Sequence, residues 1–356
     1  MVVLRGVKSS RQAGVTHRAP GRKPAARSRA RLAAVVSMAC AAGVFGATNA
    51  SAAPARPQVT AARNATTAVS RFRSGLPWPS GVFLPNGTPA QAAAFAAWRK
   101  RPLDDVEVQL GQSTWATITD PAWLYRRWKG KPYTMVFSVA MLPIDVPGVS
   151  IGACARGSYN AYWKKFGKVI NSYGLGSSII RLGWEFNGTW ERWAASNPSA
   201  WKECWRQAVT SAWSTAPRLR WDWAVNRGLS SALANPAQAY PGNHYVTMVG
   251  IDSYDWWPAV NSSGGWKKQL DGSQGLNSWL AFAKAHGKKL SVPEWGNMRY
   301  GESSGGDDPA YVKDMRAFFA ANARYIGLET VFQGPRASYE SGSVMPKSAE
   351  AYKMGF

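Results

Sequence analysis

The sequence predicts an α/β fold, a single (β/α)8 barrel of the TIM type. Apolar runs rich in β-branched and aromatic residues recur eight times after residue 76, and segments with helical periodicity separate them. Near-continuous apolar strands that alternate with helices are typical of a parallel sheet buried on both faces. Eight such units in about 280 residues fit a (β/α)8 barrel in both number and size.

The predicted strands share an apolar stretch of five to nine residues that ends at polar or turn residues. They are residues 81–85, 106–110, 134–142, 177–184, 219–225, 245–251, 289–293 and 325–332. Helical periodicity is clearest in residues 90–100, 159–173, 198–213, 276–287 and 310–324. A doubly wound open sheet is the alternative, but no G-x-G-x-x-G motif follows the first strand.

The N-terminal segment predicts export from the cell. The first 31 residues contain nine Lys or Arg and no acidic residue, and the apolar run LAAVVSMACAAGVFGA and a stretch of small residues follow. This order is typical of a secretory signal peptide, here residues 1–52 with cleavage near Ala52. Residues 53–75 are rich in Ala, Arg, Thr and Pro and predict a flexible linker. We expect residues 76–356 to form the barrel domain, which would be secreted and carry no membrane anchor after cleavage.

The charge of the chain is a weak indicator of its partner. The formal net charge is +23, and removing the nine signal-peptide cations leaves 34 Lys and Arg against 20 Asp and Glu, or +14. The remaining cations are scattered, with no run of five, so a solvated basic surface is favoured over a nucleic-acid interface. We expect a monomer that does not bind nucleic acid.

Cysteine and histidine usage limits the possible chemistry. Cys154 and Cys204 are the only cysteines after the signal peptide, and in an oxidising compartment they predict one disulfide, with two buried thiols as the alternative. Only His244 and His286 accompany them, without zinc-site spacing, so we expect no metal and no cofactor. Neither histidine follows a nucleophile-elbow motif, which disfavours a Ser-His-Asp hydrolase.

Two glutamates lie where the fourth and seventh predicted strands end. Glu185 follows SSIIRLGW within the aromatic stretch RLGWEFNGTW, and Glu294 follows KLSVP. Functional residues of a barrel gather at the carboxyl ends of its strands. One such carboxylate could be an ordinary surface residue, but two with aromatic flanks favour glycoside hydrolysis, which needs one protonated and one ionised carboxyl group. An apolar surround raises the pKa of a carboxyl group and so keeps it protonated.

These residues resemble a known family. The stretch WEFNGTWERW is similar to the acid/base motif of glycoside hydrolase family 26, in the retaining (β/α)8 glycoside hydrolase clan. The resemblance implies that Glu185 is the proton donor and acid/base, that Glu294 is the nucleophile, and that Tyr254 in GIDSYDWW hydrogen-bonds the nucleophile. It implies an endo-acting enzyme that hydrolyses a β-mannan, β-xylan or β-glucan. Trp184 departs from the pattern, because family 26 mannanases have a histidine before the acid/base.

All 19 tryptophans follow the signal peptide, and indole faces stack on sugar rings. Tryptophans at helical spacing are expected in the core: Trp98, Trp163, Trp205, Trp213 and Trp279. Those at strand ends are candidates for a cleft, including Trp115 and Trp193. The predicted substrate-binding residues are Trp184, Asn187, Trp190, Tyr254, Trp256, Trp257 and Trp295. Polar residues that could bond hydroxyls or hold the carboxylates are Arg181, Asp222, Asn226 and Asp252. A catalytically silent barrel that binds polysaccharide is the alternative function.

Overall fold

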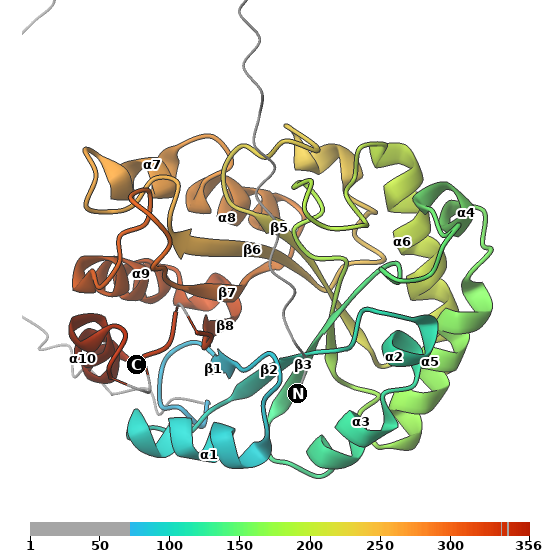
Figure 1. Ribbon diagram of the computed structural model, residues 1–356, viewed down its shortest axis with the longest axis horizontal. Helices are drawn as coiled ribbons and strands as arrows, with labels where there is room; N and C mark the ends of the chain where they lie inside the picture. The colour runs from blue at the N-terminus through green and yellow to red at the C-terminus, as the bar shows by residue number, and fades with distance from the viewer. Residues whose placement is uncertain (1–71, 336, 340–341) are drawn as a thin grey trace, which may run out of the picture. The chain divides into compact units, whose positions relative to one another are not determined.

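The computed structural model describes residues 72–335, 337–339 and 342–356, and within them eight parallel strands close into a barrel in chain order (Figure 1). The strands are β1 (Ser80–Phe83), β2 (Asp105–Gln109), β3 (Thr134–Val139), β4 (Ile179–Leu182), β5 (Arg220–Asn226), β6 (Met248–Asp255), β7 (Lys289–Asn297) and β8 (Ile326–Phe332). Strand β1 pairs with both β2 and β8, so the predicted (β/α)8 barrel is confirmed and the open sheet is wrong. The predicted signal peptide, and the predicted linker up to residue 71, lie outside the described residues.

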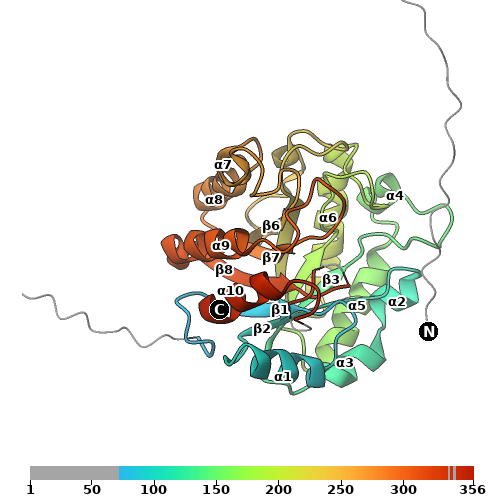
Figure 2. The ribbon, with the colours of Figure 1, turned by 60° about the vertical axis from the view of Figure 1, so that its left-hand side comes forward.

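The helices form an outer layer around the barrel (Figures 1 and 2). They are α1 (Pro89–Trp98), α2 (Trp115–Thr119), α3 (Ala122–Trp128), α4 (Ile151–Ala155), α5 (Asn160–Ser172), α6 (Pro198–Trp213), α7 (Gly265–Asp271), α8 (Leu276–Ala285), α9 (Pro309–Ala321) and α10 (Pro346–Gly355), with short 3-10 turns at Pro236–Ala239 and Ala323–Tyr325. Thr88, Asn197 and Asp308 cap α1, α6 and α9 by accepting backbone hydrogen bonds, and a proline follows each. A polar cap followed by proline fixes where a helix begins.

Large aromatic side chains fill the space between barrel and helices. Trp163, Trp205 and Trp279 are buried as predicted, while Trp98 and Trp213 are partly buried against the same core. Because each buried indole removes a large apolar area from water, this layer supplies much of the force that holds the helices on the barrel.

The disulfide predicted between Cys154 and Cys204 is present, with an S–S distance of 1.95 Å. It links α4 to α6 on the outside of the barrel, and both residues are buried. The bridge closes a loop across a sequence separation of 50 residues.

Two strands continue beyond the apolar runs that predicted them. The run for β6 ends at residue 251, but the strand reaches Asp255, and the run for β7 ends at residue 293, but the strand reaches Asn297. Of the added residues, Asp252, Tyr254 and Glu294 line the cleft at the mouth of the barrel. Asp252 pairs in register with Glu294, next to a register shift between Gly250 and Asp252. The strand extensions therefore place carboxylates from neighbouring strands side by side.

Candidate active site

A cleft of about 660 Å³ opens at the carboxyl ends of the strands. It brings together both predicted catalytic glutamates, Glu185 just after β4 and Glu294 in β7. The other residues that line it are Trp190, Asn226, Arg227, Gly228, Leu229, Ser230, Ser231, Asp252, Tyr254, Trp256, Trp257, Met298 and Phe332.

Arg181 in β4 organises the floor of this cleft. Its side chain is fully buried, and Nη1 donates to Glu294 Oε2 at 2.9 Å and to Glu107 Oε1 at 3.2 Å, while Nη2 donates to Asp252. Burial alone would lower the pKa of Arg181, but these carboxylates raise it well above its ordinary value. The arginine therefore stays charged and fixes three acidic groups from three other strands around itself.

Each carboxylate oxygen of Glu294 accepts a hydrogen bond from a neighbouring side chain. Oε1 accepts a hydrogen bond of 2.5 Å from the Tyr254 hydroxyl, and Oε2 accepts the bond from Arg181. Burial, followed by the charge of Glu294, raises the pKa of Tyr254 well above its ordinary value, so the phenol keeps its proton and remains a donor. Two donors, one of them cationic, match the negative charge of the Glu294 carboxylate and fix its orientation.

Glu185 has a different environment. Its backbone has a φ of +50°, an uncommon conformation for a residue other than glycine. Its Oε1 accepts from Asn226 Nδ2 at 2.6 Å and its Oε2 from Trp190 Nε1 at 2.8 Å. Burial raises the pKa of Glu185, the charge of Glu294 raises it further, and the hydrogen bonds and Arg181 offset only part of this rise. Glu185 therefore holds a proton at pH values where an ordinary glutamate has lost it.

Four of the predicted substrate-binding residues, all aromatic, line the cleft: Trp190, Tyr254, Trp256 and Trp257. Trp190 and Trp257 are 54% and 70% exposed, so their ring faces are open to a ligand. Trp256 packs against Tyr300, with ring centroids 5.1 Å apart, and donates from Nε1 to Ser303. These contacts hold its indole at the rim of the cleft.

Three tryptophans that the sequence predicted for the cleft do not line it, because their rings are buried elsewhere. Trp295 is fully buried between the barrel and α9 and α10, and its Nε1 donates to Glu329. Trp193 is also fully buried, with Nε1 bonded to the carbonyl of Trp184. Trp115 stacks on Tyr162, away from the cleft-lining residues. In each case the residue lies in a strand or in the segment that follows one, but its large apolar ring is buried in the helical layer.

Asn187 and Trp184 lie behind the site and do not line it. Asn187 is fully buried, and its side chain brackets the backbone of Asn226, accepting from the amide and donating to the carbonyl, each at 2.9 Å. It therefore positions the residue that holds Glu185, and its prediction as a substrate ligand is wrong. Trp184 is 6% exposed and packs against the Arg181 guanidinium and the edge of Trp193.

Sequence reasoning missed two charged residues at this end of the barrel. Glu107 in β2 bonds Arg181, Ser138 and Thr330, and burial raises its pKa to about 7. Its signal was a carboxylate inside the apolar run VEVQL. Arg227 follows β5 and lines the cleft, with no sequence signal beyond its place after a strand. Asp222, a predicted candidate, instead lies deeper, bonded to Ser291, and burial raises its pKa to about 7.

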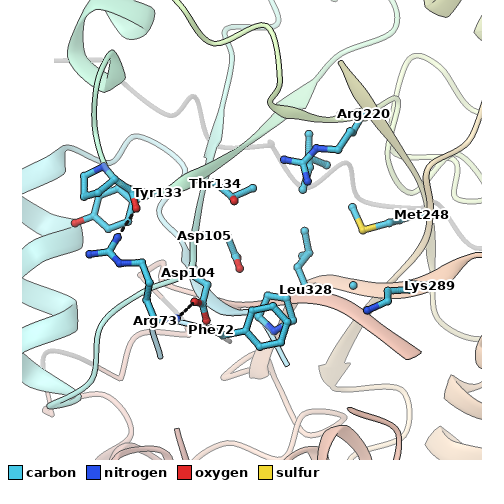
Figure 3. Close-up of a pocket in the computed structure, with 14 residues that line it drawn as sticks. Phe72, Arg73, Asp104, Asp105, Tyr133, Thr134, Arg220, Met248, Lys289 and Leu328 are labelled. Carbon is cyan, nitrogen blue, oxygen red and sulfur yellow. Dashed lines mark hydrogen bonds between the residues drawn. The ribbon is translucent and has the colours of Figure 1, made fainter. Parts of the chain in front are cut away.

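A second cavity, of about 520 Å³, lies at the opposite end of the barrel (Figure 3). The side chains of Asp105, Thr134, Arg220, Met248 and Leu328 converge on it from the amino ends of their strands. Burial raises the pKa of Asp105 well above its ordinary value. Residues at this face of a (β/α)8 barrel serve stability rather than chemistry, and neither predicted catalytic glutamate lies here.

The described residues contain no group of three or more His, Cys, Asp or Glu side chains that could hold a metal ion. Among the helices in the described part of the chain, none is long and apolar enough to cross a membrane.

Comparison with known proteins agrees with this geometry. Residues 177–293 match the sequence model of glycosyl hydrolase family 26, a segment that contains Glu185 and ends one residue before Glu294. No curated protein matches the chain.

Solved structures share the fold at low sequence identity. A Bacillus subtilis mannanase, BCman, is 14% identical with a TM-score of 0.55, over 78% of this chain and 85% of that one. A modular endo-beta-1,4-mannanase from Cellulomonas fimi is 14% identical with a TM-score of 0.56, over 77% and 70%. The mannanase BoMan26A from Bacteroides ovatus is 12% identical with a TM-score of 0.53, over 78% and 87%. The family match over residues 177–293, the barrel and the paired carboxyl groups together support a glycoside hydrolase that is similar to family 26.

Proposed function

We propose that this protein is a secreted, retaining glycoside hydrolase that cleaves a β-linked polysaccharide by double displacement. The observation that carries the proposal is the unlike environment of two carboxyl groups in one cleft. Glu294 is matched by Arg181 and Tyr254, while burial and Glu294 raise the pKa of Glu185. Two carboxyl groups with such different hydrogen-bond partners suit one nucleophile and one proton donor.

In the first step, a carboxylate oxygen of Glu294 attacks the anomeric carbon as the bond to the leaving oxygen breaks. Glu185 gives its proton to that oxygen, and a covalent glycosyl-enzyme forms. In the second step Glu185, now ionised, takes a proton from water, whose oxygen bonds the anomeric carbon and releases Glu294. Asn226 and Trp190 hold Glu185 for both proton transfers. Two inversions leave the configuration of the anomeric carbon unchanged.

The substrate class follows from the cleft and the relatives. The exposed Trp190 and Trp257 offer stacking faces for sugar rings on both sides of the β5 end. Because the solved structures include endo-acting β-1,4-mannanases, a β-mannan is the first polymer to test, with β-xylan and β-glucan next. The order of cations, apolar run and small residues at the N-terminus supports secretion, and we expect the mature enzyme to act as a monomer.

Replacement of Glu185 tests the assignment most directly. Glu185→Ala should lose about 10²- to 10⁴-fold of the turnover on a natural polymer, because general acid catalysis is absent. An activated aryl glycoside needs little protonation, so its first step should be spared and a glycosyl-enzyme should accumulate. Azide, which needs no general base, should restore turnover of the activated substrate in this variant.

Glu294→Ala is the matched variant, and it should abolish the first step on both substrates. Proton NMR of the first product formed by the wild-type enzyme should show the β anomer. Equal losses on good and poor leaving groups in Glu185→Ala, without azide rescue, would remove Glu185 from the acid/base role. A wild-type protein that binds the polymers but hydrolyses none of them would be the silent binding barrel.

A further inference from the structure

Arg227 places a second guanidinium in the cleft, on the wall formed by the ends of β5 and β6. Its Nε donates to Ser253 Oγ at 3.1 Å, and its Nη2 donates to the carbonyls of Tyr254 at 2.9 Å and Trp256 at 2.6 Å. These bonds use three of the five N–H groups of the guanidinium and fix its plane against β6. The two N–H groups of Nη1 form no hydrogen bond within the described part of the chain, and Nη1 is not sealed from solvent.

The two arginines of the cleft differ in their counter-charges. Arg181 has three carboxylates within ion-pair distance, whereas Arg227 has none among the described residues. Burial lowers the pKa of Arg227, and the charges of Tyr311 and Asp255 offset only part of this decrease. A partly buried cation without an anionic partner is costly, and a guanidinium fixed in position is suited to bind a carboxylate.

The acidic groups nearest to Arg227 are already engaged. Asp255 accepts from the amide of Val260 at 2.6 Å and from Asn297 at 3.2 Å. Asp252 and Glu294 are paired with Arg181. Glu185 accepts hydrogen bonds from Asn226, the residue before Arg227, and from Trp190, and its pKa is raised. The free edge of Arg227 is therefore the position in the cleft where an added negative charge would be stabilised.

We propose that Arg227 forms a subsite for a sugar unit that carries a carboxylate, so that the enzyme prefers an acidic, uronic acid-bearing polysaccharide over its neutral counterpart. This inference rests on the proposed function and names the substrate class of that same cleft. Ser230 and Ser231 line the same cleft as Arg227 and carry hydroxyl groups, and Trp256 and Trp257 line it with aromatic rings. The subsite thus combines a charge for the carboxylate with stacking and hydrogen-bonding groups for the ring.

The test compares polymers that differ only in their carboxylates. One pair is 4-O-methylglucuronoxylan and the same xylan after chemical reduction of its carboxyl groups. The others are β-mannan and β-glucan, each before and after partial oxidation of C6 to a carboxylate. The kcat/KM ratio of each acidic polymer to its neutral counterpart is measured at about pH 6, where an ordinary carboxyl group is ionised. The wild-type enzyme should favour the acidic polymer of the backbone it cleaves by roughly tenfold, and high salt should reduce the preference.

Arg227→Gln should bring the ratio of kcat/KM on the acidic polymer to kcat/KM on the neutral polymer to about one, whatever the lost bonds to β6 do to the absolute rates, and Arg227→Lys, which keeps the charge, should retain part of the preference. Arg192→Gln is the control, because Arg192 is an exposed arginine at the same end of the barrel that does not line the cleft. It should leave the preference unchanged. If Arg227 only clamped β6, Arg227→Gln would lower activity on both polymers equally.

A binding measurement separates this inference from the proposed function. In the Glu294→Ala background, calorimetry compares an acidic xylo-oligosaccharide with its carboxyl-reduced form, so no turnover is needed. The acidic ligand should bind more tightly than its reduced form, and Arg227→Gln should abolish this difference. That result supports the subsite even if no polymer is cleaved. A wild-type enzyme that cleaves neutral and acidic polymers equally, with equal affinities, overturns the subsite and leaves the hydrolase assignment intact.

Discussion

The hydroxyl of Tyr254 donates a hydrogen bond of 2.5 Å to Oε1 of Glu294, and the two residues reach this contact from the carboxyl halves of neighbouring strands β6 and β7. The bond exists because both strands continue past their apolar runs into the mouth of the barrel. It fixes one oxygen of the proposed nucleophile while Arg181 fixes the other.

Removal of this hydroxyl should therefore impair the first chemical step. Tyr254→Phe should lower kcat/KM about 10- to 100-fold, the usual cost of losing a hydrogen bond to a charged group. Pre-steady-state kinetics on an activated aryl glycoside should place the loss in formation of the glycosyl-enzyme. A variant with wild-type kinetics in that step would mean that Tyr254 does not position Glu294.

Trp190 should tune the pH profile as well as bind sugar. Its Nε1 bond to Glu185 favours the ionised carboxylate, so Trp190→Phe should raise the pKa of Glu185 further. The alkaline limb of kcat/KM, where the acid loses its proton, should move to higher pH. Trp257→Phe is the control, because Trp257 makes no hydrogen bond to Glu185 among the described residues, and its profile should not move.

Burial separates the roles of two tryptophans predicted alike from sequence. Trp257 is 70% exposed in the cleft, so Trp257→Ala should raise the KM for polymer roughly 3- to 10-fold without changing the melting temperature. Trp295 is fully buried, so Trp295→Ala should lower the free energy of unfolding by about 3–5 kcal/mol. Calorimetric melting of both variants, beside steady-state kinetics, checks the pair; a stable Trp295→Ala enzyme with a raised KM would contradict it.

Stability should decrease from mildly acidic to mildly alkaline pH. Burial raises the pKa of Glu107 and Asp222 to about 7 and that of Glu329 to about 8, whereas in the unfolded chain these groups ionise near pH 4. Between these values the folded protein holds protons that the unfolded chain has released, so the free energy of unfolding falls as pH rises toward 7 to 8.

The melting temperature should accordingly be higher near pH 5 than near pH 8. Glu329→Gln, which removes one titrating group that does not line the cleft, should flatten this dependence. Glu350→Gln on α10, an exposed glutamate, is the matched control and should leave the slope unchanged. A melting temperature that rises steadily across this range would show that these buried groups are ionised in the folded protein.

The disulfide should contribute to stability and little to turnover. Because the Cys154–Cys204 bridge spans 50 residues on the outside of the barrel, loop entropy predicts a loss of about 4 kcal/mol in the Cys154→Ala, Cys204→Ala variant. Its melting temperature should fall, while kcat on a small aryl glycoside, measured well below that temperature, should be close to wild type. A large drop in kcat at low temperature would show that α4 and α6 also hold the cleft.

The sequence by itself determined the barrel, its eight strands and the two glutamates, because each depends on local patterns. A parallel strand buried on both faces must be apolar along its length, and a barrel must present its strand ends at one mouth. The same rule located Glu185 and Glu294 by counting strands. The cysteine pair could be predicted because only two cysteines follow the predicted signal peptide.

Only the tertiary structure decided which side chains share the cleft. Trp257 and Trp295 both follow strand ends, yet one ring is open to solvent and the other is covered by α9 and α10, and local sequence does not encode which helix lies over a residue. The contrast between Arg181 and Arg227 also arises from partners far apart in the chain. Glu107, Asp252 and Glu294 all meet Arg181, and no carboxylate of the described residues lies within ion-pair distance of Arg227. Electrostatic interactions depend on distance and burial, which exist only once the barrel has closed.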